Sequence, residues 1–163
     1  MNITFLSKKH LPEIQAIFND AIENTSFIYE TKPRTKLTMK KWFNYHKKNN
    51  FPIIGIINNH NELEAFGTYG FFREKDAYRK TIENSVYVKK SSQGKGYGTQ
   101  ILENLIKLAQ NQGFHVMVSV IDSHNEKSLS LHRKFGFSQC GTLSEIGYKN
   151  NTWLSITMLE KIL

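Results

Sequence analysis

The sequence has little that would cross-link it, anchor it or hold a metal. A single cysteine, Cys140, cannot form a disulfide within the chain and is interpreted as a small packing side chain rather than a catalytic thiol. No apolar run approaches the roughly 18–20 residues that span a bilayer, and Met1–Leu6 is too short and unpatterned for a signal peptide. No grouping of His, Asp and Glu has metal-ligand spacing. We therefore expect a cytoplasmic protein with no metal and no membrane partner.

Positive charge is in excess, with 22 Lys and Arg against 14 Asp and Glu and a formal net charge of +8. Lysines are spread through Lys36–Lys48, Lys89–Lys95 and Lys127–Lys134. Such a surface can bind nucleic acid or attract a smaller anion. Because no helix-turn-helix, ribonucleoprotein-type aromatic motif or zinc-ligand spacing is present, the sequence favours an anionic cofactor or substrate over nucleic acid.

The chain is long enough for one compact core, and no repeat, low-complexity tract or linker divides it, so residues 1–163 are predicted to form a single domain. Apolar periodicity predicts its elements. They are a strand at Met1–Ser7, helices at His10–Asn24 and Thr38–Asn49, strands at Phe51–Asn58, Leu63–Phe72 and Thr81–Val88, a helix at Gly96–Gln112, a strand at Phe114–Ile121, a short helix from Asp122 or Asn125 to Phe135, and strands at Ser138–Ile146 and Trp153–Leu159. The order βααβββαβαββ predicts an α/β domain with a mixed sheet rather than an alternating doubly wound one.

A glycine-rich segment, Gln93-Gly94-Lys95-Gly96-Tyr97-Gly98-Thr99, lies between a predicted strand and a predicted helix. Glycines at alternate positions remove the Cβ atoms that would keep a ligand away from the backbone. Successive amides and the positive end of the following helix form an anion site. The segment therefore predicts the binding of a phosphate or pyrophosphate group.

Three other interpretations of this glycine loop remain open at this point. A Walker P-loop needs Ser or Thr after Gly-Lys, whereas Gly96 follows Lys95 here. A dinucleotide fingerprint needs glycines directly after the strand, the spacing G-x-G-x-x-G and room for a second mononucleotide-binding half. A glycine-rich turn without a ligand is the third possibility.

The motif Gln93-x-x-Gly96-x-Gly98 is similar to the Q/R-x-x-G-x-G/A coenzyme A signature of the GCN5-related N-acetyltransferases. Further segments resemble the phosphinothricin and methionine sulfoximine acetyltransferase branch of that family. They are residues 78–88 (YRKTIENSVYV), 113–118 (GFHVMV), 130–137 (SLHRKFGF), and Ile146-Gly147-Tyr148-Lys149 followed by Trp153-Leu154. The resemblance covers nearly the whole chain. It implies a mixed sheet that splays between its two middle strands, Thr81–Val88 and Phe114–Ile121, with acetyl-CoA in the resulting V.

The resemblance also implies a set of cofactor-binding residues. Backbone amides of Val86, Tyr87 and Val88 would bind the pantetheine arm and polarise the thioester carbonyl. Asn125 would hydrogen-bond the pantetheine. The pyrophosphate would lie on the glycine loop, and the residues concerned are Gln93, Gly94, Lys95, Gly96, Tyr97, Gly98 and Thr99.

Two side chains are candidates for catalysis. Amine attack on a thioester needs a base, and the resemblance places it at Glu83; the structural alternative is a surface carboxylate paired with Arg79 or Lys80. His132 stands where the wider superfamily commonly has a tyrosine that protonates the leaving thiolate, and an imidazole pKa near 6.5 permits proton transfer in either direction. The alternative for His132 is a packing role.

The acceptor is less well specified. Arg73 matches an arginine that contacts the acceptor in the resembling branch, and a guanidinium binds a carboxylate or phosphinate well. The predicted acceptor is therefore the amine of a small amino acid that carries an oxidised sulfur or phosphorus centre. The predicted lining residues are Arg73, Glu74, Lys75, Glu83, Asn84 and Ser85.

The chain departs from the family pattern at two positions. The family often has His where this chain has Asn84, and Asp where it has Ser155. These departures concern the acceptor pocket and the contacts of an expected homodimer. Two alternatives therefore stay open. One is acetylation of another amine, such as a protein N-terminus, a polyamine or an aminoglycoside. The other is a non-catalytic module that binds acyl-CoA or nucleic acid.

Overall fold

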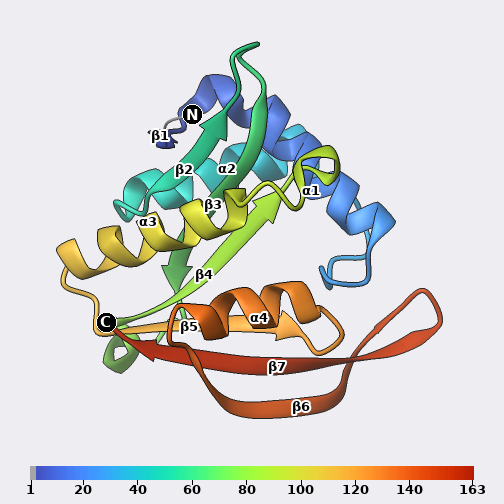
Figure 1. The fold of residues 1–163 in the computed structure, drawn as a ribbon, viewed down its shortest axis with the longest axis vertical. Helices are drawn as coiled ribbons and strands as arrows, with labels where there is room; N and C mark the ends of the chain where they lie inside the picture. Colours follow the sequence, from blue (N-terminus) through green and yellow to red (C-terminus); the bar gives the residue numbers. More distant parts are fainter. Residues whose placement is uncertain (1–2) are drawn as a thin grey trace.

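The computed structural model describes residues 3–163, so Met1 and Asn2 of the first predicted strand lie outside the described part. Figure 1 shows a sheet with helices on both of its faces. In chain order the elements are β1 (Ile3–Phe5), α1 (Leu11–Asn24), α2 (Lys36–Lys48), β2 (Ile53–Ile57), β3 (Leu63–Phe71), β4 (Thr81–Val88), α3 (Tyr97–Asn111), β5 (Val116–Asp122), α4 (Glu126–Lys134), β6 (Ser138–Lys149) and β7 (Thr152–Ile162), with short 3₁₀ turns at Lys8–His10, Asp76–Tyr78 and Lys90–Ser92. The predicted element order is confirmed.

The seven strands form one sheet in the order β1-β2-β3-β4-β5-β7-β6. Neighbouring strands are antiparallel except β4 and β5, which are parallel, so the sheet is mixed as predicted. Two hydrophobic clusters cover its two faces. One surrounds the apolar stripe of α3 and includes Leu129 of α4, and the other joins α1 and α2 through residues such as Ile14 and Met39.

Several element boundaries differ from the prediction by a few residues, and two of these differences have a clear structural cause. Helix α2 begins at Lys36 rather than near Thr38, because the Thr35 hydroxyl accepts a hydrogen bond from the Thr38 amide at 3.2 Å and so caps the helix three residues earlier. Strand β6 runs to Lys149, beyond the predicted Ile146. An irregularity between Leu143 and Gly147 lets it continue, with Glu145 at a φ of 52°.

The parallel strands β4 and β5 pair only at their beginnings. Their register comprises Thr81 with Val116, Ile82 with Met117 and Glu83 with Val118. Beyond these positions β4 remains paired with β3, and β5 remains paired with β7. Figure 1 shows the two strands diverging from this common start. The splay predicted between the two middle strands is therefore confirmed.

Candidate active site

The glycine loop precedes α3 and is open to solvent. Gly94 and Gly96 have φ values of 80° and 79°, which favour glycine, and a Cβ added at either would meet no atom within 4 Å. Gly96 is the N-cap of α3, whose first-turn amides point toward the loop. Gly98 instead serves packing, because a Cβ there would lie 3.3 Å from Leu131 Cδ2 of α4. The loop therefore offers an anion an exposed backbone at a positive helix end.

A buried carboxylate holds the segment that leads into this loop. Glu64 of β3 accepts hydrogen bonds from the Ser92 hydroxyl and from Asn58 Nδ2, the latter at 2.6 Å. The Ser92 hydrogen bond is the main cause of a lowered pKa for Glu64, and the charges of Lys89 and Lys95 act in the same direction. Sequence analysis missed Glu64, although a charged residue inside the apolar strand Leu63–Phe71 was a usable signal.

Glu83 lies at the last paired position before β4 and β5 separate. It is half-buried, and burial raises the pKa of its carboxyl group, while the charge of Arg73 acts against that rise. Arg79 and Lys80, the cations of the alternative interpretation of Glu83 as a paired surface carboxylate, contact other groups. Arg79 pairs with Asp76 at 3.5 Å, and Lys80 Nζ donates to the Gly113 carbonyl at 3.0 Å.

The side chains of β4 alternate between the two faces of the sheet. Tyr87 packs against Phe18 of α1 with ring centroids 4.6 Å apart, so Glu83, Ser85 and Tyr87 share the face that carries α1 and α2. Asn84 faces the opposite way, toward α3 and α4. The structure therefore brings Glu83 together with Ser85 but does not bring Asn84 to the same side.

Asn84 is part of a buried polar group that includes His132. Asn84 Nδ2 lies 3.0 Å from His132 Nε2, and the Ser119 hydroxyl donates to Asn84 Oδ1. His132 Nδ1 lies 2.8 Å from the Ser128 carbonyl oxygen. Burial lowers the pKa of His132, and the Ser128 hydrogen bond only partly opposes this. Both ring nitrogens of His132 thus have a hydrogen-bond partner. Sequence analysis did not identify Ser119 as a member of this group.

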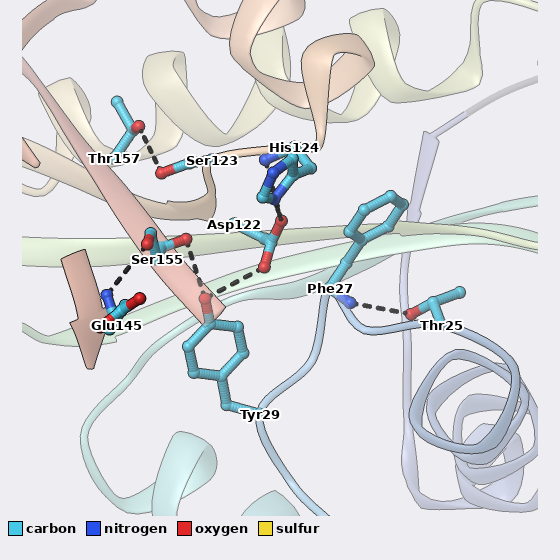
Figure 2. A network of polar contacts seen from close by, with 9 residues as sticks. All are labelled: Thr25, Phe27, Tyr29, Asp122, Ser123, His124, Glu145, Ser155 and Thr157. Carbon is cyan, nitrogen blue, oxygen red and sulfur yellow. Dashed lines mark hydrogen bonds and ion pairs between the residues drawn. The ribbon is translucent and has the colours of Figure 1, made fainter. Parts of the chain in front are cut away.

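Asn125 is the N-cap of α4, and its side-chain oxygen accepts a hydrogen bond from the Ser128 amide at 3.2 Å. Just before it, the wholly buried carboxylate of Asp122 ends β5. Figure 2 shows Asp122 receiving hydrogen bonds from the Tyr29 hydroxyl at 3.0 Å and from the His124 amide at 2.9 Å. The Tyr29 hydroxyl also lies 2.9 Å from the Ser155 carbonyl oxygen. The segment between α1 and α2 is therefore tied to the ends of β5 and β7.

Lys149 ties the same segment to the end of β6. Its ammonium group donates to the carbonyl oxygens of Ile22, Ile28 and Thr25 at 2.6, 2.8 and 3.0 Å. Sequence analysis placed Lys149 in a motif but did not predict this anchor.

The three predicted acceptor-contacting residues after β3 are all exposed. They are Arg73, Glu74 and Lys75. The Arg73 guanidinium lies over the Phe72 ring, 4.2 Å from its centroid, and donates to the Phe72 carbonyl at 2.9 Å. Its charge influences Glu83, which connects this exposed loop electrostatically with the half-buried carboxyl group.

Two further features concern only the described residues. Between residues 3 and 163, no three His, Cys, Asp or Glu side chains gather closely enough to hold a metal ion. None of the helices in that range combines the length and the apolar character needed to span a bilayer.

The sequence model of the acetyltransferase (GNAT) family matches residues 14–137, more than half of the chain. The chain belongs to this family. The resemblance on which the glycine loop was interpreted is thereby confirmed, as is the assignment of the chain as an acyltransferase enzyme.

Known proteins similar to this acetyltransferase include the L-methionine sulfoximine/L-methionine sulfone acetyltransferase of Pseudomonas aeruginosa. It is 38% identical over 150 residues, which are 92% of this chain and 87% of that protein. A crystal structure of an N-acetyltransferase from Staphylococcus aureus Mu50 has a TM-score of 0.96 at 40% identity, covering 99% of this chain and 97% of that one. A phosphinothricin acetyltransferase from Sinorhizobium meliloti, solved in complex with acetyl-CoA, has a TM-score of 0.96 at 26% identity and covers 99% of this chain and 88% of that one.

Proposed function

We propose that this acetyltransferase transfers the acetyl group of acetyl-CoA to the amine of a small amino-acid-like acceptor of the methionine sulfoximine, methionine sulfone or phosphinothricin type. The observation that carries the proposal is the position of Glu83. A half-buried carboxyl group with a raised pKa stands at the point where β4 and β5 separate. The names of the similar enzymes support the acceptor class.

The donor fits the residues of the glycine loop. The exposed Gly94–Gly96 backbone and the N-terminus of α3 would hold the pyrophosphate, with charge from Lys95. The separated part of β4, at Val86–Val88, would present backbone groups to the pantetheine arm, and Asn125 would lie beside it. Acetyl-CoA, when bound, supplies an activated thioester, and the residues of this chain position it and control protons.

Glu83 is the proposed general base. An amine is mostly protonated near neutral pH and attacks only as the free base. A carboxyl group whose pKa is raised toward the working pH is a better proton acceptor than an ordinary surface glutamate. Glu83 takes the proton as the nitrogen–carbon bond forms and the carbon–sulfur bond breaks. The departing thiolate takes one proton from water and Glu83 returns its proton to water, so no proton is gained or lost overall.

Arg73 is the proposed acceptor-binding residue, together with Ser85 on the face of β4 that carries Glu83. The guanidinium is exposed, donates a hydrogen bond to the carbonyl of the neighbouring Phe72 and lies over its ring, which supports its availability to a carboxylate or an oxidised side-chain group. The role predicted for His132 as a proton donor to the leaving thiolate remains a prediction.

The proposal is tested by thiol release from acetyl-CoA with a panel of acceptors. The panel contains methionine sulfoximine, methionine sulfone, phosphinothricin, unmodified amino acids, polyamines, aminoglycosides and peptides. We expect the oxidised amino acids to give the highest kcat/KM. A higher kcat/KM for a polyamine, an aminoglycoside or a peptide would overturn the acceptor assignment, and acetyl-CoA binding without any turnover would overturn catalysis.

The base is tested by Glu83→Gln. We expect kcat to fall by about 10²–10⁴-fold, because general base catalysis typically contributes this much, while the Kd for acetyl-CoA stays the same. Glu103→Gln is the matched control, since Glu103 is exposed on α3 and pairs with Lys107. Equal kcat in Glu83→Gln and in the control would remove Glu83 from the mechanism.

We also propose that the enzyme is a cytoplasmic homodimer that associates through the β6–β7 hairpin. Four large apolar side chains on these strands are between 44% and 59% exposed, and they are Leu143, Ile146, Tyr148 and Trp153. Sedimentation velocity should show a dimer for the natural chain and a monomer for Trp153→Glu. A natural chain that sediments as a monomer would refute the dimer.

A further inference from the structure

Ser119, Asn84 and His132 link three elements through their side chains. Ser119 lies on β5, Asn84 on β4 and His132 on α4, and consecutive members are hydrogen-bonded. All three are buried, at 1%, 7% and 3% exposure. Backbone pairing of β4 with β5 ends one residue before Asn84 and Ser119. Side-chain hydrogen bonds therefore join β4 and β5 at the first position beyond their backbone pairing.

The donors and acceptors in this group specify one protonation state. The Ser128 carbonyl can only accept, so His132 Nδ1 carries a hydrogen. The Ser119 hydroxyl donates to Asn84 Oδ1, which leaves the Asn84 NH₂ group facing His132 Nε2. An amide NH₂ group can only donate, so Nε2 presents its lone pair. The imidazole is then neutral, with its single proton on Nδ1.

A proton on His132 Nε2 would face another donor. It would also place a charge among side chains that are almost wholly removed from water, which is unfavourable without a partner of opposite charge. These hydrogen bonds therefore keep His132 Nε2 as a hydrogen-bond acceptor. Asn84 directly follows Glu83 in β4, so a displacement of the Asn84 backbone also displaces the residue that carries the proposed base.

We propose that Asn84, Ser119 and His132 are positioning residues, which fix the separation of β4 and β5 beside Glu83, and that His132 acts there as a neutral hydrogen-bond acceptor rather than as the acid for the leaving thiolate. The expected effect of these residues on kcat rests on the proposed acetyl transfer. The protonation state of the His132 ring does not depend on that proposal.

The tautomer is measured on the natural chain by long-range ¹H–¹⁵N NMR correlation of the ¹⁵N-labelled histidines, with His132→Gln used to assign the signal. We expect a neutral His132 ring with its proton on Nδ1 across the pH range in which the enzyme is active. A ring protonated on Nε2, or one that gains a second proton in that range, would overturn the proposal. This measurement decides the inference even if no acceptor on the panel is acetylated.

The positioning role is measured by comparing His132→Ala with His132→Gln. The glutamine carbonyl can replace Nε2 as an acceptor for Asn84, but an amide cannot donate a proton as an acid. His132→Ala should lower kcat by about 10–100-fold, the scale expected of a small displacement of reacting groups. His132→Gln should be at least about tenfold faster than His132→Ala, because the acceptor position is kept.

Asn84→Leu keeps the size of the side chain and removes both of its hydrogen bonds. It should lower kcat to the level of His132→Ala, with a smaller change in the acceptor KM. Circular dichroism of each variant establishes that it is folded before its rate is compared. Equal losses in folded His132→Ala and His132→Gln would favour an acid role and overturn the proposal, as would an Asn84→Leu variant with the kcat of the natural chain.

Discussion

Replacing Lys149 by methionine tests whether one buried cation holds the segment between α1 and α2. The Lys149 ammonium group donates to three carbonyl oxygens in and beyond the last turn of α1, at 2.6–3.0 Å. Lys149 as a whole residue is only 6% exposed. Methionine preserves the length and the apolar stem of the side chain but provides no donor. The substitution therefore removes the hydrogen bonds with little change in packing volume.

The expected loss follows from these three contacts. A hydrogen bond to a charged group contributes about 1.5–3 kcal/mol, but three bonds to one ammonium group are not additive, and its desolvation cost disappears with it. We expect the free energy of unfolding to fall by about 3–5 kcal/mol, because three carbonyl oxygens lose their donor and each buried polar group left without a partner costs about 1–3 kcal/mol. For a chain of this size that corresponds to a Tm lower by on the order of 10 °C.

Urea unfolding followed by circular dichroism measures the change, with thermal unfolding as a second probe. Lys127→Met on α4 is the matched control, because Lys127 is exposed and its replacement should change stability by less than about 0.5 kcal/mol. A loss of less than about 1 kcal/mol in Lys149→Met would show that water replaces the ammonium group at these carbonyls, and the reasoning would fail.

Three further substitutions test other contacts. Tyr29→Phe removes a donor to the buried Asp122 carboxylate, and the urea midpoint should report a loss of about 1–3 kcal/mol; an unchanged midpoint would contradict this. Gly67→Ala would place a Cβ in collision with Ile101 Cγ2 of α3, so calorimetry should show destabilisation of about 1–3 kcal/mol from overpacking, and an equal Tm would refute it. Arg73→Met removes a charge that lowers the pKa of Glu83, so this pKa should rise and the acidic limb of kcat/KM should move to higher pH. If the acidic limb stays in place or moves to lower pH, the charge of Arg73 does not lower the pKa of Glu83 and the prediction is wrong.

Much of the fold could be predicted because its signals are local. Three such signals are the apolar stripe of α3, the left-handed glycine at its N-cap and the largely apolar run of β5, and each is contained in a short stretch of sequence. The family resemblance added the splay, which depends on two strands whose paired residues, such as Thr81 and Val116, are more than 30 positions apart along the chain. The boundary of α2 was misplaced because Thr35 and Thr38 are both reasonable caps, and only the direction of the Thr35–Thr38 hydrogen bond distinguishes them.

The polar contacts around the site could not be predicted in the same way, because they join residues that only the folded chain brings together. Asn84 and His132 are 48 positions apart, and Lys149 reaches the end of α1 across more than 120 positions. One part was nevertheless accessible from sequence. Successive side chains of a strand point to opposite faces, so Glu83 and Asn84, predicted together as acceptor-lining residues, could not both face one pocket. That alternation assigns them different surroundings. Glu83 shares a face with Ser85 and Tyr87, while Asn84 faces α4, where His132 is its partner. The two neighbours therefore give different results when they are replaced. Glu83→Gln should remove the base without disturbing the His132 tautomer, whereas Asn84→Leu should keep the Glu83 carboxyl group and lower kcat by displacing it.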